Sequence, residues 1–160
     1  MKVKYSDLKN KRVFITGGSS GIGGSIVEHF CEQGSEVYFV DIDLKETKKL
    51  LNKIKKNKLR TPTFIECNLL DINKLEKIIK NIISKKGPIN CLVNNAANDD
   101  RHTTDQVDEK YWENRMAINL KHYFFAAKAV VKSMKKIKTG SIINLSSVSW
   151  MLGEGDKVVY

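Results

Sequence analysis

Val13-Phe14-Ile15-Thr16-Gly17-Gly18-Ser19-Ser20-Gly21-Ile22-Gly23 is the stretch that decides how this chain folds. A short apolar run leads into a glycine-rich turn, and the apolar residues Ile22, Ile26, Val27 and Phe30 then lie on one face of a helix. A strand that turns into a helix in this way presents backbone N–H groups and the positive end of a helix dipole to a phosphate. The stretch therefore predicts a nucleotide-binding corner.

The next residues make this corner more specific. Gly34 ends the predicted helix, and a second apolar run over residues 37–40 ends on Asp41. Strand, glycine turn, helix, strand and terminal acid is the layout of a dinucleotide site. The glycine spacing differs from the common G-x-G-x-x-G, since Gly17, Gly21 and Gly23 are separated by three residues and then by one. A glycine turn that binds no ligand is the alternative, and this context disfavours it.

Composition narrows the class of protein. The chain has 160 residues and a net charge of +10, and no apolar run is long enough for a membrane span or a secretory signal, so we expect a cytoplasmic protein without a membrane partner. Cys31, Cys67 and Cys91 lack metal-type spacing, which predicts buried free thiols and no metal site. The basic run 45–60 is interpreted as a solvated helix face rather than a nucleic-acid surface, because no aromatic residues interleave its lysines.

Apolar runs and helical patterns alternate along the whole chain. We expect strands at residues 12–16, 36–41, 63–67, 89–94 and 140–146, and helices at 21–33, 44–56, 72–85 and 108–137. This alternation predicts one α/β domain over residues 1–160, a Rossmann-like doubly wound parallel sheet in three α/β/α layers. The polar clusters fall where strands end, so a ligand is expected at the carboxyl edge of the sheet, near its topological switch point.

Four motifs resemble the short-chain dehydrogenase/reductase family, and the resemblance covers essentially the whole chain. Residues 16–23 look like its TGxxxGxG cofactor loop, and residues 94–97 look like its NNAG motif with Ala97 where glycine is usual. Asn119 matches the asparagine of its central helix, and Ser147 and Tyr160 have the spacing of its catalytic serine and tyrosine. Residues 94–103, 111–131 and 147–150 also resemble bacterial aldose 1-dehydrogenases of the galactose and xylose type.

The resemblance implies an NAD-dependent oxidoreductase that transfers hydride from a sugar or other secondary alcohol. In that case Tyr160 is the base, Ser147 orients the reacting oxygen and Asn119 holds a water that passes protons to solvent. Taken singly, Ser147 could be an ordinary strand-end serine and Asn119 a helix-interior asparagine. The substrate would contact Ser147, Trp150 and Tyr160, although Trp150 suits loop packing equally well. The resemblance also implies a homo-oligomer for the full-length form.

The histidines and the loop after the fourth strand are less informative. For Arg101 and His102 a surface loop is favoured over contacts with sugar hydroxyls. His29 and His122 lie within helical patterns and are interpreted as structural.

The expected cofactor contacts come from the glycine corner and from three further strand ends. They are Gly17, Ser19, Ser20, Gly21, Ile22, Gly23, Asp41, Ile42, Asn68, Leu69, Asn95, Ala96 and Ala97. The Asp41 carboxylate would accept hydrogen bonds from both ribose hydroxyls and repel a 2′-phosphate, which favours NAD over NADP. Asn68 resembles the residue that reads the adenine amino group, or is a turn asparagine. Ala97 adds a methyl group that is expected to restrict the backbone slightly.

The sequence stops at Tyr160, whereas the family has a lysine four residues after this tyrosine, two more strands and a substrate-capping loop. We therefore expect a C-terminally truncated member whose tyrosine frays and has a raised pKa beside the terminal carboxylate. Strand 141–145 is expected to form an apolar sheet edge. The 160-residue chain alone should bind NAD weakly or not at all, and should turn over no sugar. A non-catalytic dinucleotide-binding subunit, an inactive fragment or a basic nucleic-acid adaptor are the alternatives.

Overall fold

A computed structural model describes residues 3–152 and 155–159, without the side chain of Trp150. In these ranges five parallel strands form one sheet in the order β3-β2-β1-β4-β5. The strands are β1 (Arg12–Thr16), β2 (Glu36–Asp41), β3 (Thr63–Glu66), β4 (Cys91–Asn94) and β5 (Ser141–Asn144). Because β1 pairs with β2 on one side and β4 on the other, the switch point lies between β1 and β4.

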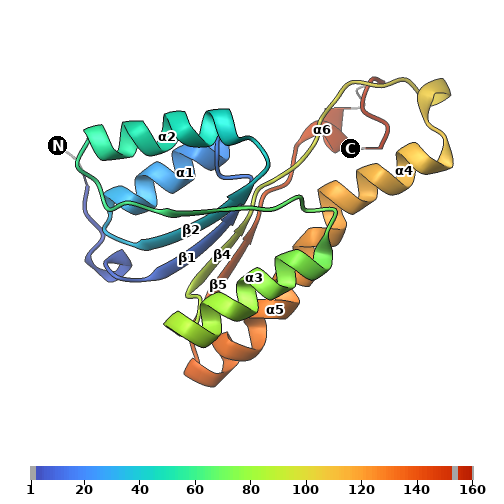
Figure 1. Cartoon of the computed structure of the whole chain (residues 1–160). Helices are drawn as coiled ribbons and strands as arrows, with labels where there is room; N and C mark the ends of the chain where they lie inside the picture. The colour runs from blue at the N-terminus through green and yellow to red at the C-terminus, as the bar shows by residue number, and fades with distance from the viewer. Residues whose placement is uncertain (1–2, 153–154, 160) are drawn as a thin grey trace.

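Helices cover both faces of the sheet, as Figure 1 shows. Helices α1 (Gly21–Glu32) and α2 (Leu44–Lys56) lie on one face, and α3 (Ile72–Lys86) and α5 (His122–Ile137) lie on the other. A π-helix (Ala117–Lys121) joins α4 (Glu109–Met116) to α5. Helix α6 (Ser149–Leu152) and two short 3₁₀ turns (Ser6–Leu8 and Thr104–Gln106) complete the described elements. The predicted three-layer Rossmann-like fold is confirmed.

Two hydrophobic cores lie on the two sides of the sheet, because successive strand residues point to opposite faces. In β1, Val13 and Ile15 pack with Val27 of α1 and Ile54 of α2. Phe14, between them in sequence, packs into the other core with residues of α3 and α5. All three β1 residues are fully buried, as expected for a central parallel strand covered on both sides.

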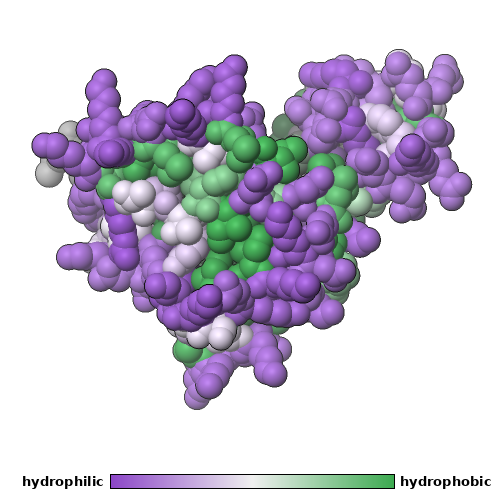
Figure 2. All heavy atoms as spheres, in the orientation of Figure 1, coloured by the Kyte–Doolittle hydropathy of each residue, from purple (hydrophilic) through white to green (hydrophobic). Residues whose placement is uncertain are grey.

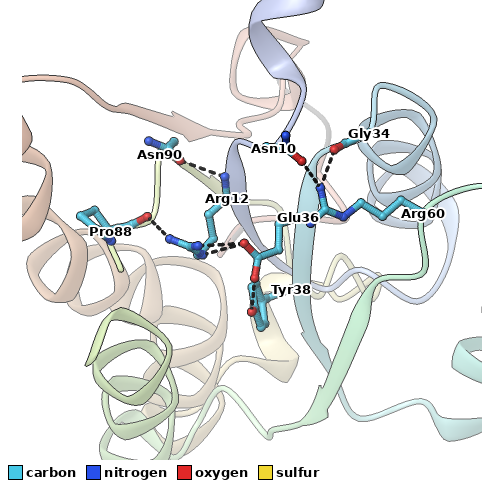
Figure 3. Close-up of polar contacts among 8 residues, drawn as sticks. All are labelled: Asn10, Arg12, Gly34, Glu36, Tyr38, Arg60, Pro88 and Asn90. Carbon is cyan, nitrogen blue, oxygen red and sulfur yellow. Dashed lines mark hydrogen bonds and ion pairs between the residues drawn. The ribbon is translucent and has the colours of Figure 1, made fainter. Parts of the chain in front are cut away.

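The amino ends of β1 and β2 are joined by a polar cluster (Figure 3). Arg12 pairs with Glu36 at 2.8 Å and donates to the Pro88 carbonyl oxygen, also at 2.8 Å. Glu36 accepts a hydrogen bond from Tyr38 at 2.6 Å. Burial raises the pKa of Glu36, but the hydrogen bonds from Tyr38 and Arg12 and the Arg12 charge outweigh it, so the pKa is lowered. The cluster stabilises the amino ends of β1 and β2, which lie opposite the predicted site.

The structure corrects several predicted boundaries. Strand β4 starts at Cys91 rather than at residue 89. Asn90 does not pair as a strand residue but forms hydrogen bonds with the backbone of Arg12, through its side-chain oxygen and its N–H. Ile89 is buried in the core. Strands β3 and β5 end at Glu66 and Asn144, one and two residues earlier than expected. The single helix predicted over residues 108–137 is divided by the π-helix, and α6 was not predicted.

The surface is uneven in polarity. Figure 2 shows hydrophilic side chains over α2, whose lysines are exposed while Thr47, Leu50 and Ile54 are buried. Strand β5 lies at one edge of the described sheet, where Ile142 and Ile143 are 39% and 45% exposed, as expected for an apolar edge. No helix among the described residues is long and apolar enough to cross a membrane.

Candidate functional site

The glycine corner (residues 16–23) lies at the carboxyl end of β1, against the switch point (Figure 1). Gly21 has a φ of +52°, and a side chain at this position would meet nothing within 4 Å, so the amino end of α1 is open. Gly23 is crowded instead, since a Cβ there would lie 1.9 Å from the Gly17 carbonyl oxygen. The corner thus requires glycine at position 21 for its conformation and at position 23 for close packing.

The amino end of α1 differs from those of its neighbours. Asp43, Asp71 and Asp108 accept hydrogen bonds from the first turns of α2, α3 and α4. Ser20, at the same position of α1, makes no such side-chain bond. The first N–H groups of a helix have no partner within it, so those of α1 can receive a phosphate oxygen.

Asp41 is held on the glycine corner by backbone donors. Its Oδ2 accepts from the Ser19 N–H at 2.9 Å, and its Oδ1 accepts from the N–H groups of Ile42 and Asp43 at 2.7 and 3.1 Å. A carboxylate offers about four acceptor positions, so about one remains for a ligand hydroxyl rather than the expected two. The Asp43 side chain instead caps α2 by accepting from the Glu46 N–H at 2.9 Å.

The loop after β4 is bonded directly to the corner. The Asn95 side-chain amide donates to the carbonyl oxygens of Thr16 and Gly17 at 3.1 and 2.9 Å. In return, the backbone N–H groups of Asn95 and Ala96 donate to the Thr16 hydroxyl at 3.0 and 3.2 Å. These bonds bring two sequence motifs, 79 residues apart, into one rigid wall of the site.

Four further predicted contacts lie around this wall. Ile22 and Ile42 are 67% and 61% exposed, so apolar surface is available there for a base or ring. Asn68 Oδ1 accepts from the Leu70 N–H at 3.0 Å, which is the turn geometry of the alternative interpretation. Leu69 is buried in the core, so it can offer a ligand only its backbone.

Ala97, the residue that stands where the family motif has glycine, is exposed. Among the described residues, positive φ outside glycine occurs at Asn10, Lys58 and Lys138, so Ala97 has ordinary backbone geometry. The methyl group of Ala97 therefore causes no backbone strain, because the backbone at this position lies outside the left-handed region.

His122 lies behind the corner and is fully buried. Its Nε2 is 3.4 Å from the Thr16 hydroxyl. Burial lowers the pKa of His122 to about 4, against a smaller raising effect of a backbone hydrogen bond with Ile118. The imidazole is therefore neutral at neutral pH and packs edge-on against Tyr123. His29, in contrast, is exposed and bonds to Ser25 within α1.

Asn119 lies in the π-helix, where its side chain binds the loop after β4. Its Oδ1 accepts from the Asn98 N–H at 2.7 Å, and its Nδ2 donates to the Asn98 carbonyl oxygen at 3.1 Å. A π-helix is rare and frequently found at functional sites. Asn119 is thus no ordinary helix-interior asparagine, because both ends of its side chain fix the backbone of another segment.

Ser147 lies between β5 and α6. Its hydroxyl is 2.8 Å from the Ser149 hydroxyl and accepts from the Ser149 N–H at 3.1 Å. Sequence reasoning missed Ser149, although it stands in the quoted segment 147–150. Tyr160 and the side chain of Trp150 lie outside the described residues, so their predicted roles have no geometry here.

The surface-loop interpretation of His102 is wrong. His102 is only 4% exposed, whereas Arg101 is exposed and pairs with Asp156 at 2.7 Å. Both bind the segment 156–159, which comes more than 50 residues later and gave no local signal. Sequence reasoning also missed Asn98. Its position directly after the 94–97 motif is the signal in the sequence that could have indicated a role in the site.

No group of three or more His, Cys, Asp or Glu side chains suited to a metal ion occurs among the described residues. Burial raises the pKa of the Cys31 thiol to about 12 and that of Cys91 to about 11, so both are neutral. All three cysteines are free, as predicted, and Cys31 and Cys67 are buried, whereas Cys91 is only partly buried, which corrects the prediction at that position.

The glycine corner at the switch point is bonded to the asparagine motif after β4, and this pair of motifs agrees with one protein family. A family model described as short chain dehydrogenase matches residues 11–160. The chain belongs to the short-chain dehydrogenase family. The predicted family is confirmed, and it is a family of nicotinamide-dinucleotide oxidoreductases.

Two similar relatives within the family are named for sugars. The chain is 40% identical over 156 residues to the D-xylose 1-dehydrogenase of Caulobacter vibrioides, which covers 98% of this chain and 61% of that protein. It is 37% identical over 149 residues to a protein of Rhizobium meliloti named probable galactose dehydrogenase, covering 93% and 58%.

A solved structure extends the comparison. The aldohexose dehydrogenase of Thermoplasma acidophilum, in ligand-free form, superposes with a TM-score of 0.81 at 29% identity, covering 97% of this chain and 56% of that one. The chain thus spans 56% to 61% of the length of these three dehydrogenases.

Proposed function

We propose that this chain carries the cofactor site and part of the catalytic site of an NAD-dependent dehydrogenase of sugars or other secondary alcohols. The observation that carries the proposal is the uncapped glycine corner with Asp41 fixed upon it at the switch point. The names of the xylose and galactose relatives support an aldose as substrate.

The residues at the corner fit a dinucleotide. The open backbone at Gly21 and the uncapped first turn of α1 suit a pyrophosphate, and the remaining acceptor position of Asp41 suits a ribose hydroxyl. A 2′-phosphate would meet the Asp41 charge. Lys49 and Lys53 line a hollow of about 280 Å³ beside Ser20, but each is paired with a glutamate at 2.6 Å. We therefore propose NAD rather than NADP.

The proposed chemistry divides among three side chains. When bound, the nicotinamide supplies the hydride acceptor. Tyr160 as a phenolate would take the hydroxyl proton of the substrate, which leaves the carbon free to release its hydride. The Ser147 hydroxyl, oriented by Ser149, would hold the reacting oxygen, and Trp150 would face the sugar ring.

Asn119 contributes differently from the expectation. Because its side chain is bonded at both ends to Asn98, we propose that it fixes the floor of the site through this loop. A water-holding role would then fall to its backbone rather than its amide. The full-length protein as a cytoplasmic homo-oligomer remains a prediction, as do the adenine contact of Asn68 and the inactivity of the 160-residue chain alone.

A non-catalytic dinucleotide-binding subunit is the second candidate, since the uncapped corner and the fixed Asp41 would suit a cofactor whether or not a reaction follows its binding. Turnover distinguishes the two. The protein translated from the complete reading frame that contains this sequence should reduce NAD with an aldose. NAD binding without turnover on a panel of aldoses and secondary alcohols would favour the binding subunit.

Cofactor choice is tested at Asp41. Calorimetry of the protein from the complete reading frame with NAD and NADP should show a preference for NAD, and D41S should shift the ratio of the two dissociation constants toward NADP by about tenfold or more. D43S is the matched control, because Asp43 caps α2 and is expected to leave the ratio unchanged. A wild-type preference for NADP would contradict the proposal, and so would an equal shift in D43S.

A further inference from the structure

His102 is a buried histidine whose two ring nitrogens are both in use. Its Nδ1 lies 2.9 Å from the Asp100 carbonyl oxygen, and its Nε2 lies 3.1 Å from the Val159 backbone nitrogen. A carbonyl oxygen only accepts, so Nδ1 carries the proton, and an amide N–H only donates, so Nε2 is the acceptor. The two partners therefore fix one neutral tautomer of the ring.

The same loop binds the segment before residue 160 at further points. The His102 N–H donates to the Asp156 carbonyl oxygen at 2.8 Å, and His102 forms an isolated parallel bridge with Lys157. The Arg101 guanidinium donates to both carboxylate oxygens of Asp156, at 2.8 and 2.7 Å. Val159 is 8% exposed, so the end of this segment is buried as well as hydrogen-bonded.

The other end of the loop is fixed to the helix that carries Asn119. Besides the two bonds between Asn119 and Asn98, Arg115 donates to the Asn98 carbonyl oxygen and to the Asp100 carboxylate, each at 3.1 Å. Arg115 is 7% exposed and lies 4.7 Å from the centre of the Tyr111 ring. Tyr111 in turn packs against His102 with the rings tilted by 52° and their centres 4.9 Å apart.

These contacts form one connected path from the π-helix to Val159. Figure 1 shows the loop, α4 and α6 gathered beyond the carboxyl ends of the strands, away from the sheet that could otherwise support them. Each end of residues 98–102 is bonded to a different part of the candidate catalytic site. The path therefore holds the segment 156–159 to the helix that carries Asn119.

We propose that residues 98–102 form a brace between the helix that carries Asn119 and the segment 156–159, and that His102 is a positioning residue that fixes Val159, the residue before Tyr160 in the sequence. The inference rests on the proposed function, because Tyr160 matters to turnover only if it is the base. His102 touches neither substrate nor cofactor in this assignment. It acts through the hydrogen bond that its Nε2 accepts from Val159.

Two isosteres separate the two ring nitrogens. In H102Q the side-chain oxygen reaches the depth of Nε2 and can still accept from Val159. In H102N the amide nitrogen replaces Nδ1, so the bond to Asp100 is kept and the acceptor for Val159 is lost. H29N is the matched control, because His29 is exposed and bonds only within α1.

The first measurement is amide hydrogen exchange of the 160-residue chain. We expect Val159 to be protected in the wild type and H29N, to lose about tenfold or more of its protection in H102N, and to keep most of it in H102Q. Protection of the β1 and β4 amides should not change. Equal exchange of Val159 in wild type and H102N would overturn the brace, and so would equal loss in H102N and H102Q.

The second measurement is turnover by the protein from the complete reading frame. H102N should lower kcat by about tenfold with the dissociation constant for NAD unchanged, and H102Q should restore most of it. Altered exchange at Val159 with unchanged kcat would overturn the positioning role. A wild-type protein that binds NAD but turns over no alcohol would overturn the proposed function instead, and the exchange data alone would then decide the brace.

Discussion

Replacing Gly23 by alanine tests the packing of the glycine corner without any ligand. The added Cβ would lie 1.9 Å from the Gly17 carbonyl oxygen and 2.5 Å from Asn95 Nδ2. Both atoms are fixed, because Asn95 Nδ2 itself donates to the Gly17 and Thr16 carbonyl oxygens. The corner must therefore move by about 1 Å or more to reach an ordinary contact distance.

The cost can be worked out from these contacts. Overpacking costs about 1–3 kcal/mol, and each of the two Asn95 hydrogen bonds contributes about 1 kcal/mol, against a helix-propensity gain of about 1 kcal/mol for alanine. We expect G23A to lower the free energy of unfolding by about 2–4 kcal/mol. In the protein from the complete reading frame it should also weaken NAD binding, because the corner proposed to hold the phosphate is displaced.

G24A is the matched control in the next turn position of the same helix. A Cβ there meets the Ser19 carbonyl oxygen at 3.3 Å, which a shift of a few tenths of an ångström relieves, so the propensity gain dominates. Urea unfolding followed by far-UV circular dichroism should show G24A equal to or more stable than wild type. If G23A unfolds within about 0.5 kcal/mol of G24A, the packing argument is refuted.

Three further predictions concern titratable groups. The pKa of Glu36 is lowered because hydrogen bonds from Tyr38 and Arg12 outweigh the raising effect of burial, so its contribution is present at neutral pH and lost in acid. Urea titrations should therefore show E36Q less stable at neutral pH and less sensitive to acid than wild type; parallel acid limbs would contradict this. Burial lowers the pKa of His122 to about 4, so the unfolded chain binds its proton first and stability falls from about pH 6.5 toward 4, by up to ~1.4 kcal/mol per pH unit. H122F should remove that part of the slope, and an unchanged slope would argue against a neutral buried ring. Burial raises the pKa of Cys31 to about 12, so a thiol reagent should modify it only after denaturant is added, and rapid reaction of the folded chain would show that the site opens.

The strands and most helices could be predicted because each is marked locally. The run Val13-Phe14-Ile15 before Thr16, and the glycine at position 34, place β1 and the end of α1 within a residue. The same local signals could not show the π-helix. Residues 108–137 have continuous helical periodicity, and the extra residue in that turn accompanies the tertiary bond between Asn119 and Asn98.

The candidate site was predictable where a motif meets a strand end. Asp41 and Asn95 are both found at the corner, although the carboxylate of Asp41 is more fully occupied by backbone donors than expected. The burial of His102 could not be predicted, since its partners Asp156 and Val159 lie 54 and 57 residues later. Sequence reasoning places a loop residue by its neighbours in sequence, and the partners of His102 are distant.

The central place of β1 has a consequence for how the chain is built. Arg12 is followed by its β2 partner Glu36 after 24 residues, but by Asn90, beside β4, only after 78. Closing the longer loop costs about 1 kcal/mol more in chain entropy, so the unit of β1, α1 and β2 is favoured to assemble first. During synthesis the other edge of β1 stays unpaired until β4, which begins at Cys91, has been made. The glycine corner is thus formed early beside β2, and β4 pairs later with the other edge of β1 and completes the wall against which a cofactor would rest.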